Sequence, residues 1–141
     1  MASIGILGAR KYRDKQSVLE FLRRLPADSV VVTSSCKGVC SWARIEAEAR
    51  GLEIKIFSPD LNNIRAKFEV AQRYYERNRQ LIEASDAVYA FVSEEAGFTG
   101  GTRFEVEYAL KLGKPVELHW ENTNPESFSK DWLVFFQETF A

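Results

Sequence analysis

The segment Gly100-Gly101-Thr102 combines two glycines with a hydroxyl side chain at the predicted start of a helix. Glycines let the backbone come close to a phosphate, and the free N–H groups and dipole of a helix N-terminus favour negative charge. The same three residues would also form an ordinary glycine turn in which Thr102 caps the helix. The pattern is therefore typical both of an anion-binding loop and of a simple helix start.

Glu105 follows this segment by one helical turn, so its carboxylate can reach back to the mouth of a pocket formed there. A carboxylate beside a bound ribose can act as a nucleophile or stabilise an oxocarbenium-like centre. Thr102 and Glu105 also match the T-x-x-E pattern of a capping box. From the spacing alone, the capping box is the favoured interpretation.

Two other loops carry groups that could bind an oxyanion. The turn SSCKG offers the Ser34 and Ser35 hydroxyls, the Lys37 ammonium and Gly38 at a predicted helix start. A serine N-cap would explain the same turn equally well. In Gly8-Ala9-Arg10, the arginine could pair with a phosphate or be an ordinary solvated side chain.

The two cysteines, Cys36 and Cys40, lie four residues apart, and the chain has a single histidine, His119. A zinc site needs more ligands than this set provides, so we expect neither a metal nor a cofactor. Two reduced thiols are favoured over a disulfide, because the N-terminus is not a signal peptide and a reducing compartment is expected.

Length and composition restrict the class of protein. The 141 residues fit one domain, with 45% hydrophobic and 28% charged residues. No apolar run is long enough for a membrane helix, so we expect a cytoplasmic protein without a membrane partner. The net charge of -1 argues against binding of extended nucleic acid, although a local basic pocket is compatible with it.

Alternating strands and helices are predicted along the chain. Short apolar runs indicate strands at residues 3–7, 29–33, 53–57, 86–92 and 115–119. Helical spacing indicates helices from residue 14 to Pro26, and at about 39–50, 65–84, 102–112 and 125–140. The third run alternates in polarity, which is typical of a sheet edge. In the third helix we expect Phe68, Ala71, Tyr75, Leu81 and Ile82 to pack inward.

This alternation predicts an α/β, Rossmann-like domain with a parallel sheet covered by helices on both faces. In such sheets, ligands bind beyond the carboxyl ends of the strands. The rule selects four loops, at residues 8–10, 34–38, 58–60 and 93–102. Asp60 enters the candidate site through the third of these loops.

Several segments occur in an order that resembles a known superfamily. They are GILGAR, VVTSSCKGVCSWA, FSPD, ERNRQLIEASDAVYAFV, GGTRFEVEYAL and GKPV. Together they are similar to the DprA/lonely-guy-like (SLOG) Rossmannoid superfamily, and most of all to its small stand-alone nucleotide-recognition members. The resemblance extends to about His119 and implies the strand order 3-2-1-4-5. Those members usually carry an acidic residue where this chain has Cys40.

A narrower resemblance concerns the lonely-guy phosphoribohydrolases. Arg77 falls at their arginine before the fourth strand, Gly101-Thr102 at their G-T pair, and Glu105 at their glutamate. Asn78 replaces their lysine, and the loop SEEAGFTG is longer than their P-G-G. The segment GTRFEVEYALKLGKPV also resembles nucleoside deoxyribosyltransferases, in which the glutamate is the nucleophile. The resemblance therefore implies catalytic roles for Arg77 and Glu105.

The function predicted from all of this is binding of a nucleotide or nucleoside, with cleavage or transfer of its N-glycosidic bond. The alternative is a non-catalytic sensor or sink for a nucleotide-derived signal. The predicted ligand-binding residues are Gly8, Arg10, Ser34, Ser35, Lys37, Gly38, Asp60, Asn78, Gly100, Gly101 and Thr102. The C-terminal aromatic stripe of Trp132, Phe135, Phe136 and Phe140 indicates a homo-oligomer, or else covers the subunit's own sheet.

Overall fold

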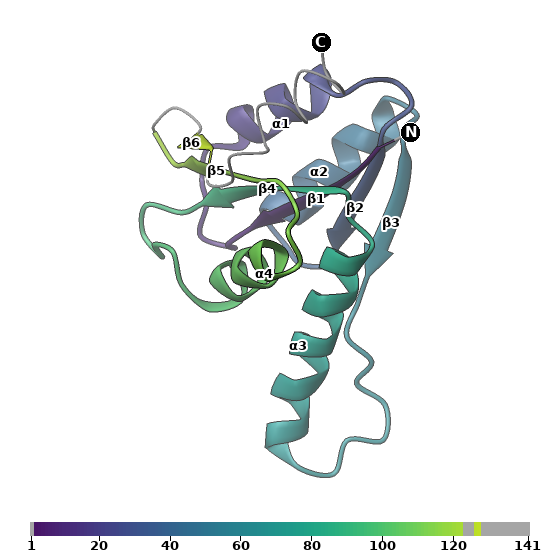
Figure 1. The fold of residues 1–141 in the computed structure, drawn as a ribbon, viewed down its shortest axis with the longest axis vertical. Coiled ribbons are helices and arrows are strands. Elements are labelled where there is room, and N and C mark those ends of the chain that lie inside the picture. Colours follow the sequence, from purple (N-terminus) through teal and green to yellow (C-terminus); the bar gives the residue numbers. More distant parts are fainter. Residues whose placement is uncertain (1, 123–125, 128–141) are drawn as a thin grey trace.

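A computed structural model describes residues 2–122 and 126–127 of the chain (Figure 1). Five parallel strands lie in the order β3-β2-β1-β4-β5, as predicted. Their bounds are β1 Ser3–Gly8, β2 Val30–Ser34, β3 Glu53–Phe57, β4 Ala87–Val92 and β5 Val116–Trp120. The chain has the α/β Rossmann-like fold that the alternating pattern predicted.

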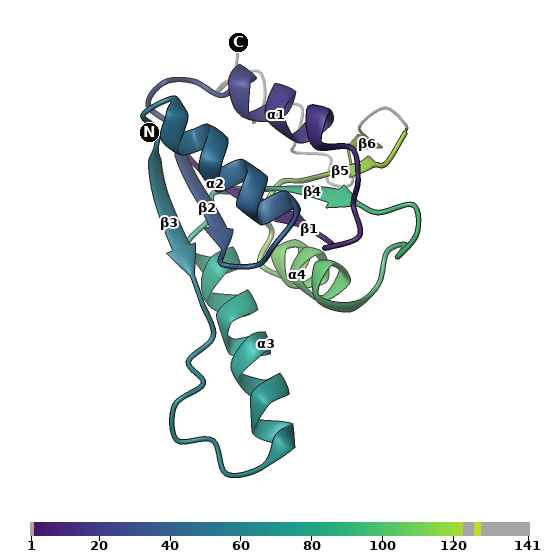
Figure 2. The ribbon, with the colours of Figure 1, turned by 180° about the vertical axis from the view of Figure 1, so that it is seen from behind.

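In the described part of the chain, four helices cover the two faces of the sheet. They are α1 Lys15–Arg24, α2 Val39–Ala49, α3 Lys67–Glu83 and α4 Gly100–Lys111. Helices α1 and α2 lie on one face, seen in front in Figure 2, and α3 and α4 lie on the other. Strands β2 and β4 are buried at every position because both of their faces are covered. Strand β3 is at the edge, which confirms the prediction from its alternating sequence.

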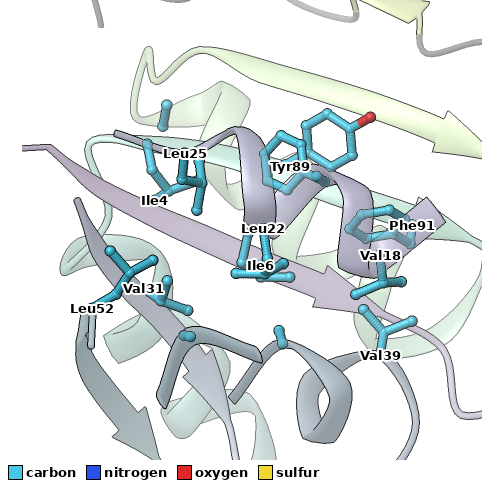
Figure 3. Close-up of a cluster of buried hydrophobic side chains, with 14 of the residues drawn as sticks. Ile4, Ile6, Val18, Leu22, Leu25, Val31, Val39, Leu52, Tyr89 and Phe91 are labelled. Atoms are coloured by element: carbon cyan, nitrogen blue, oxygen red, sulfur yellow. The ribbon is translucent and has the colours of Figure 1, made fainter. Parts of the chain in front are cut away.

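The core consists of two apolar layers separated by the sheet. On the α1–α2 face, Phe21 stacks on Tyr89 with ring centroids 3.8 Å apart. Ile4 and Ile6 of β1 belong to the same layer, in which Ile6 neighbours Tyr89 (Figure 3). The opposite layer uses the intervening strand positions, such as Val88 in β4. Because successive side chains of a strand point to opposite faces, a continuous apolar strand supplies both layers.

Helix α3 differs from the prediction in how it packs. Only its C-terminal part is buried, through Leu81 and Ile82, whereas Phe68 is 64% exposed and Tyr75 is 43% exposed. Ala71 is also exposed. The N-terminal half of α3 extends past the ends of the strands (Figure 1), so its apolar residues have no sheet to pack against. Tyr75 instead lies against Phe104 of α4, with ring centroids 4.6 Å apart.

The C-terminal segment also departs from the prediction. Residues Glu126–Ser127 form a short strand, β6, which pairs antiparallel with β5. The chain turns at Asn122, which adopts a φ of 64°. A helix beginning at about residue 125 is therefore wrong, and the rest of the predicted helix, with its aromatic stripe, lies outside the described residues. None of the helices in the described part is long and apolar enough to cross a membrane.

Candidate functional site

Three of the predicted loops meet at one cavity. It has a volume of about 330 Å³ and lies beyond the carboxyl ends of β1, β2 and β4. Eight of the predicted site residues line it: Gly8, Arg10, Ser34, Arg77, Gly100, Gly101, Thr102 and Glu105. The volume is at the lower end of the range for small-molecule sites. The geometry brings these residues together, and their role in binding stays a prediction.

The glycines of the first two loops are explained by close packing. A methyl group on Gly8 would lie 2.5 Å from the Cβ of Val39, so β1 and the start of α2 can approach only because Gly8 has no side chain. Gly38 precedes α2 with a φ of +81°, and a methyl group there would meet the Arg10 backbone at 3.3 Å. Gly8 therefore lies in the wall of the cavity, and Gly38 lets the loop before α2 pass close to the backbone of Arg10, which lines the cavity.

Two helices begin at the cavity. Helix α2 starts after Gly38 and α4 starts after Thr99, and neither has a side-chain N-cap. Thr102 as the cap of the fourth helix is therefore wrong. The helix begins two residues earlier, because Thr99 is extended and the chain enters the helix at Gly100. The uncapped N-termini of α2 and α4 bring two positive dipole ends to the same region.

Arg77 is the buried cation of the site. Its residue is only 7% exposed, and its Nε donates to Asn78 Oδ1 at 2.8 Å. Its Nη1 lies 3.6 Å from Cys36 Sγ. Among the described residues, no carboxylate forms an ion pair with it. A buried charge without a counter-ion is costly, so an anion in the cavity would complete this arrangement.

Glu105 faces the same cavity and is 8% exposed. A methyl group on Gly101 would lie 3.9 Å from its Oε1 and 3.7 Å from Asn78 Nδ2, so both side chains lie over the first turn of α4. Within the described part of the chain, the Glu105 carboxyl has no hydrogen-bond partner, so the capping box with Thr102 does not form.

The electrostatic setting makes Glu105 an acid near neutral pH. Burial raises the pKa of its carboxyl from 4.5 to about 8, the Arg77 charge opposes this shift, and the Cys36 thiol adds to it. The carboxyl is therefore mostly protonated at pH 7. A protonated carboxyl can donate a hydrogen bond or a proton to a ligand.

Two further cavities adjoin the first one at Arg77. One, of about 360 Å³, is lined by Ser35, Lys37 and Tyr74 and also by Arg10. The other, of about 320 Å³, is lined by Asp60 and Arg73. Of the remaining predicted residues, Asn78 lies behind Arg77 as its hydrogen-bond acceptor, and Gly38 lies outside the lining. Except for Asn78 and Gly38, the predicted residues thus line three cavities that share Arg77.

A wider depression of about 630 Å³ lies nearby, at the end of β5. Its lining is mainly acidic, with Asp14, Glu94, Glu95 and Glu121. These carboxylates would repel a phosphate. By volume alone this depression would be chosen as the ligand site, but its negative charge is unsuited to the predicted phosphate ligand.

Sequence reasoning missed three residues that shape the site. Cys36 lines both the first and the second cavity. Arg44 donates to the backbone oxygens of Ser34 and Cys36 and so fixes that loop. Glu121 accepts backbone N–H groups from the β1–α1 and β4–α4 loops. Only Cys36 had a signal in the sequence, its place inside SSCKG.

Comparison with known proteins identifies the fold. No protein-family model and no curated protein sequence matches the chain. DNA processing protein A from Helicobacter pylori matches with a TM-score of 0.66 at 21% identity, over 98% of this chain and 74% of that one. DNA processing protein A from Streptococcus pneumoniae matches with a TM-score of 0.68 at 18% identity, over 98% of this chain but only 56% of that one.

These matches correct one prediction and support another. The Helicobacter pylori protein is described with a mode of binding single-stranded DNA, so the expectation of no extended nucleic-acid partner is wrong. That expectation relied on the net charge of the whole chain. Net charge does not report local clusters of cations such as Arg10, Lys37 and Arg77. The resemblance to the DprA side of the superfamily is supported at the level of the fold. The narrower likeness to phosphoribohydrolases and deoxyribosyltransferases stays an interpretation of motifs. The chain has the α/β Rossmann-like fold of the part of DNA processing protein A that it matches.

Proposed function

We propose that this protein binds a nucleotide through its phosphate in the cavity at Arg77. The observation that carries the proposal is the burial of Arg77 without a carboxylate partner in the described residues. Two uncapped helix N-termini and the Arg10 side chain add positive potential around the same volume. A phosphate is an anion with several acceptor oxygens, and it suits a guanidinium and free backbone N–H groups.

We further propose that Glu105 acts on the N-glycosidic bond of the bound nucleotide. Its neutral carboxyl would give its proton to the leaving base as the C1′–N bond breaks. The carboxylate left behind would stabilise the positive charge at C1′, and it would take back a proton from the water that then adds to C1′. The products would be the free base and the sugar phosphate. The supporting feature is a buried carboxyl without a hydrogen-bond partner among the described residues, in the same cavity as the phosphate site.

The test combines binding and turnover. Calorimetry with AMP, GMP, CMP and UMP would measure affinity, and chromatography would detect released base. We expect Arg77→Gln to weaken binding by about tenfold to a hundredfold, as for loss of a charged hydrogen bond. Arg79→Gln is the matched control, because Arg79 lies on the same helix against Phe104, outside the cavity lining.

The two parts of the proposal fail in different ways. Equal affinity of wild type and Arg77→Gln for every nucleotide would refute the phosphate site. Glu105→Gln should keep its affinity within a few-fold and lose at least about a hundredfold in turnover. If wild type binds a nucleotide tightly but releases no base, the protein is a non-catalytic nucleotide sensor.

A second candidate function is binding of single-stranded DNA, favoured by the presence of three cavities that share Arg77 in their linings. Together the linings include the start of α4, the loop after β2 and Asp60. Lys37 and Tyr74 in the second cavity could hold a phosphate and stack on a base. Lys37→Gln should then weaken oligothymidylate binding and leave AMP binding unchanged, with the exposed Lys55→Gln as control. Equal loss for both ligands, or none, would refute this reading.

A further inference from the structure

Cys36 stands at the junction of two cavities and is the accessible thiol of the chain. Its side chain is half-buried, whereas Cys40 is only 4% exposed. Cys36 lines the 330 Å³ cavity and the neighbouring 360 Å³ cavity. A reagent that enters either cavity therefore comes next to Cys36.

The surroundings of Cys36 favour the thiolate and attract anions. Arg77 Nη1 lies 3.6 Å from Sγ, and Arg10 lines both cavities. Burial raises the pKa of the thiol, but hydrogen bonds from Ser34 and Arg77 and the Arg77 charge together bring it below its ordinary value. Thiolates beside arginines are the reactive form of cysteine.

The charges that line the two cavities are mostly positive. They comprise the cations Arg10, Lys11, Lys37 and Arg77 and one carboxyl, Glu105. Glu105 is mostly neutral at pH 7, so it opposes this field little. Glu105 is also an independent sign of a ligand, because it is 8% exposed, faces the cavity and has no hydrogen-bond partner in the described residues.

We propose that Cys36 is a modification site for small anionic disulfides, and that the resulting mixed disulfide fills the cavity. The Cys36 thiolate attacks one sulfur of the disulfide, whose S–S bond breaks as the new S–S bond forms. The other half leaves as a thiolate, which takes a proton from water. No further oxidant is needed, and a free thiol reverses the step. Obstruction of nucleotide binding by the adduct rests on the proposed function, but the thiol chemistry does not.

Charge selectivity distinguishes this site from an ordinary exposed cysteine. Wild type would be incubated with oxidised glutathione, which is anionic, and separately with cystamine, which is cationic. Intact-mass spectrometry would follow the rate at which each adduct forms. Each rate would be divided by the rate at which the same disulfide reacts with free cysteine, which removes the difference in intrinsic reactivity. We expect one adduct per chain and an anionic preference of at least about tenfold, the lower range of electrostatic steering. Arg10→Gln should reduce the preference, and Arg79→Gln should not.

Peptide mapping of modified wild type assigns the adduct without requiring any variant to fold. Cys36→Ser should abolish the adduct, and Cys40→Ser should retain it. The proposal is overturned if the adduct is on Cys40, or if the corrected rates with glutathione and cystamine are equal. It is also overturned if urea-unfolded chain shows the same anionic preference.

Competition connects the thiol to the nucleotide site. A saturating concentration of AMP should slow glutathionylation of Cys36, and the adduct should abolish AMP binding until dithiothreitol removes it. Undiminished AMP binding by the adduct would overturn the claim that the disulfide fills the cavity. If AMP does not bind at all and the anionic preference persists, the proposed function fails while the modification site stands.

Discussion

Replacement of Glu105 by glutamine tests the electrostatics of the site without any ligand. Glutamine has nearly the same shape and stays neutral at every pH, so the change removes only the titration. The folded state raises the pKa of the Glu105 carboxyl to about 8 from 4.5. The folded state therefore holds this proton in a range where the unfolded chain has released it.

The direction and the size of the pH dependence of stability follow from this difference between the folded and unfolded pKa values of Glu105. The contribution of Glu105 to the stability of wild type is greatest below pH 4.5, falls as the pH rises toward 8 and is constant above that. The pKa interval from 4.5 to about 8 corresponds to about 1.36 kcal/mol per pH unit. The stability lost on ionisation of Glu105 therefore has an upper limit of about 5 kcal/mol. At pH 7 the same arithmetic gives Glu105→Gln an advantage of about 3 kcal/mol over wild type.

Urea unfolding of both proteins from pH 5 to pH 9 would measure this difference. Other groups titrate in the same range, including Glu117, whose pKa burial raises to about 7. Glu117 does not interact with Glu105 and contributes equally to both proteins, so the free-energy difference between them reports Glu105 and the two cysteines whose charge interacts with it. We expect that difference to grow by about 4 kcal/mol over the range. Parallel stability curves would show that Glu105 is solvated and would remove the basis for its role as an acid.

Three further substitutions test the framework of the site, each by urea unfolding. Gly8→Ala should cost about 1–3 kcal/mol, because the new methyl group would lie 2.5 Å from Val39 Cβ. Glu121→Ala should cost about 2–4 kcal/mol, because three backbone N–H groups in two loops lose their acceptor. Lys114→Met should cost about 1–3 kcal/mol, because its ammonium donates to three carbonyls at the end of α3.

Each of these changes has a matched control. Gly101→Ala should be tolerated, since its methyl group would meet nothing closer than 3.7 Å. Glu107→Ala breaks only an exposed i,i+4 ion pair and should cost less than about 1 kcal/mol. Lys111→Met removes an exposed cation near the end of α4. A control that costs as much as its partner would contradict the structural reason given for that partner.

The sheet could be predicted because its signal is local. The sequences VVVTS and AVYAFV have consecutive apolar residues in place of alternation, and both strands are buried at every position, as expected for strands covered on both faces. EIKIF alternates, and β3 is an edge strand. The strand order came partly from resemblance, because period and composition do not specify which strands are neighbours. In the structure the register of β1 with β2 and β4 fixes that order.

Prediction failed where long-range packing decides the outcome. Phe68 and Tyr75 have the spacing of a buried face, but α3 is longer than the sheet that it covers. The pattern T-x-x-E at Thr102 and Glu105 fits a capping box, but α4 begins at Gly100 and the carboxyl faces the cavity instead. A local pattern specifies which partner a side chain could have, and the surrounding fold decides which one it meets.

The site also divides into features that local sequence predicts and features that depend on long-range packing. The strand-end rule was sufficient to select the loops that line the cavity, since parallel strands bring their carboxyl ends to one edge. It said nothing of Arg77, which comes from the C-terminal part of α3 and reaches the cavity from the side. Only resemblance marked that residue, and only the structure shows its burial without a carboxylate partner in the described chain. The chemistry of the cavity therefore depends on how α3 docks, because that docking sets the Arg77 guanidinium beside Cys36 and within electrostatic range of Glu105.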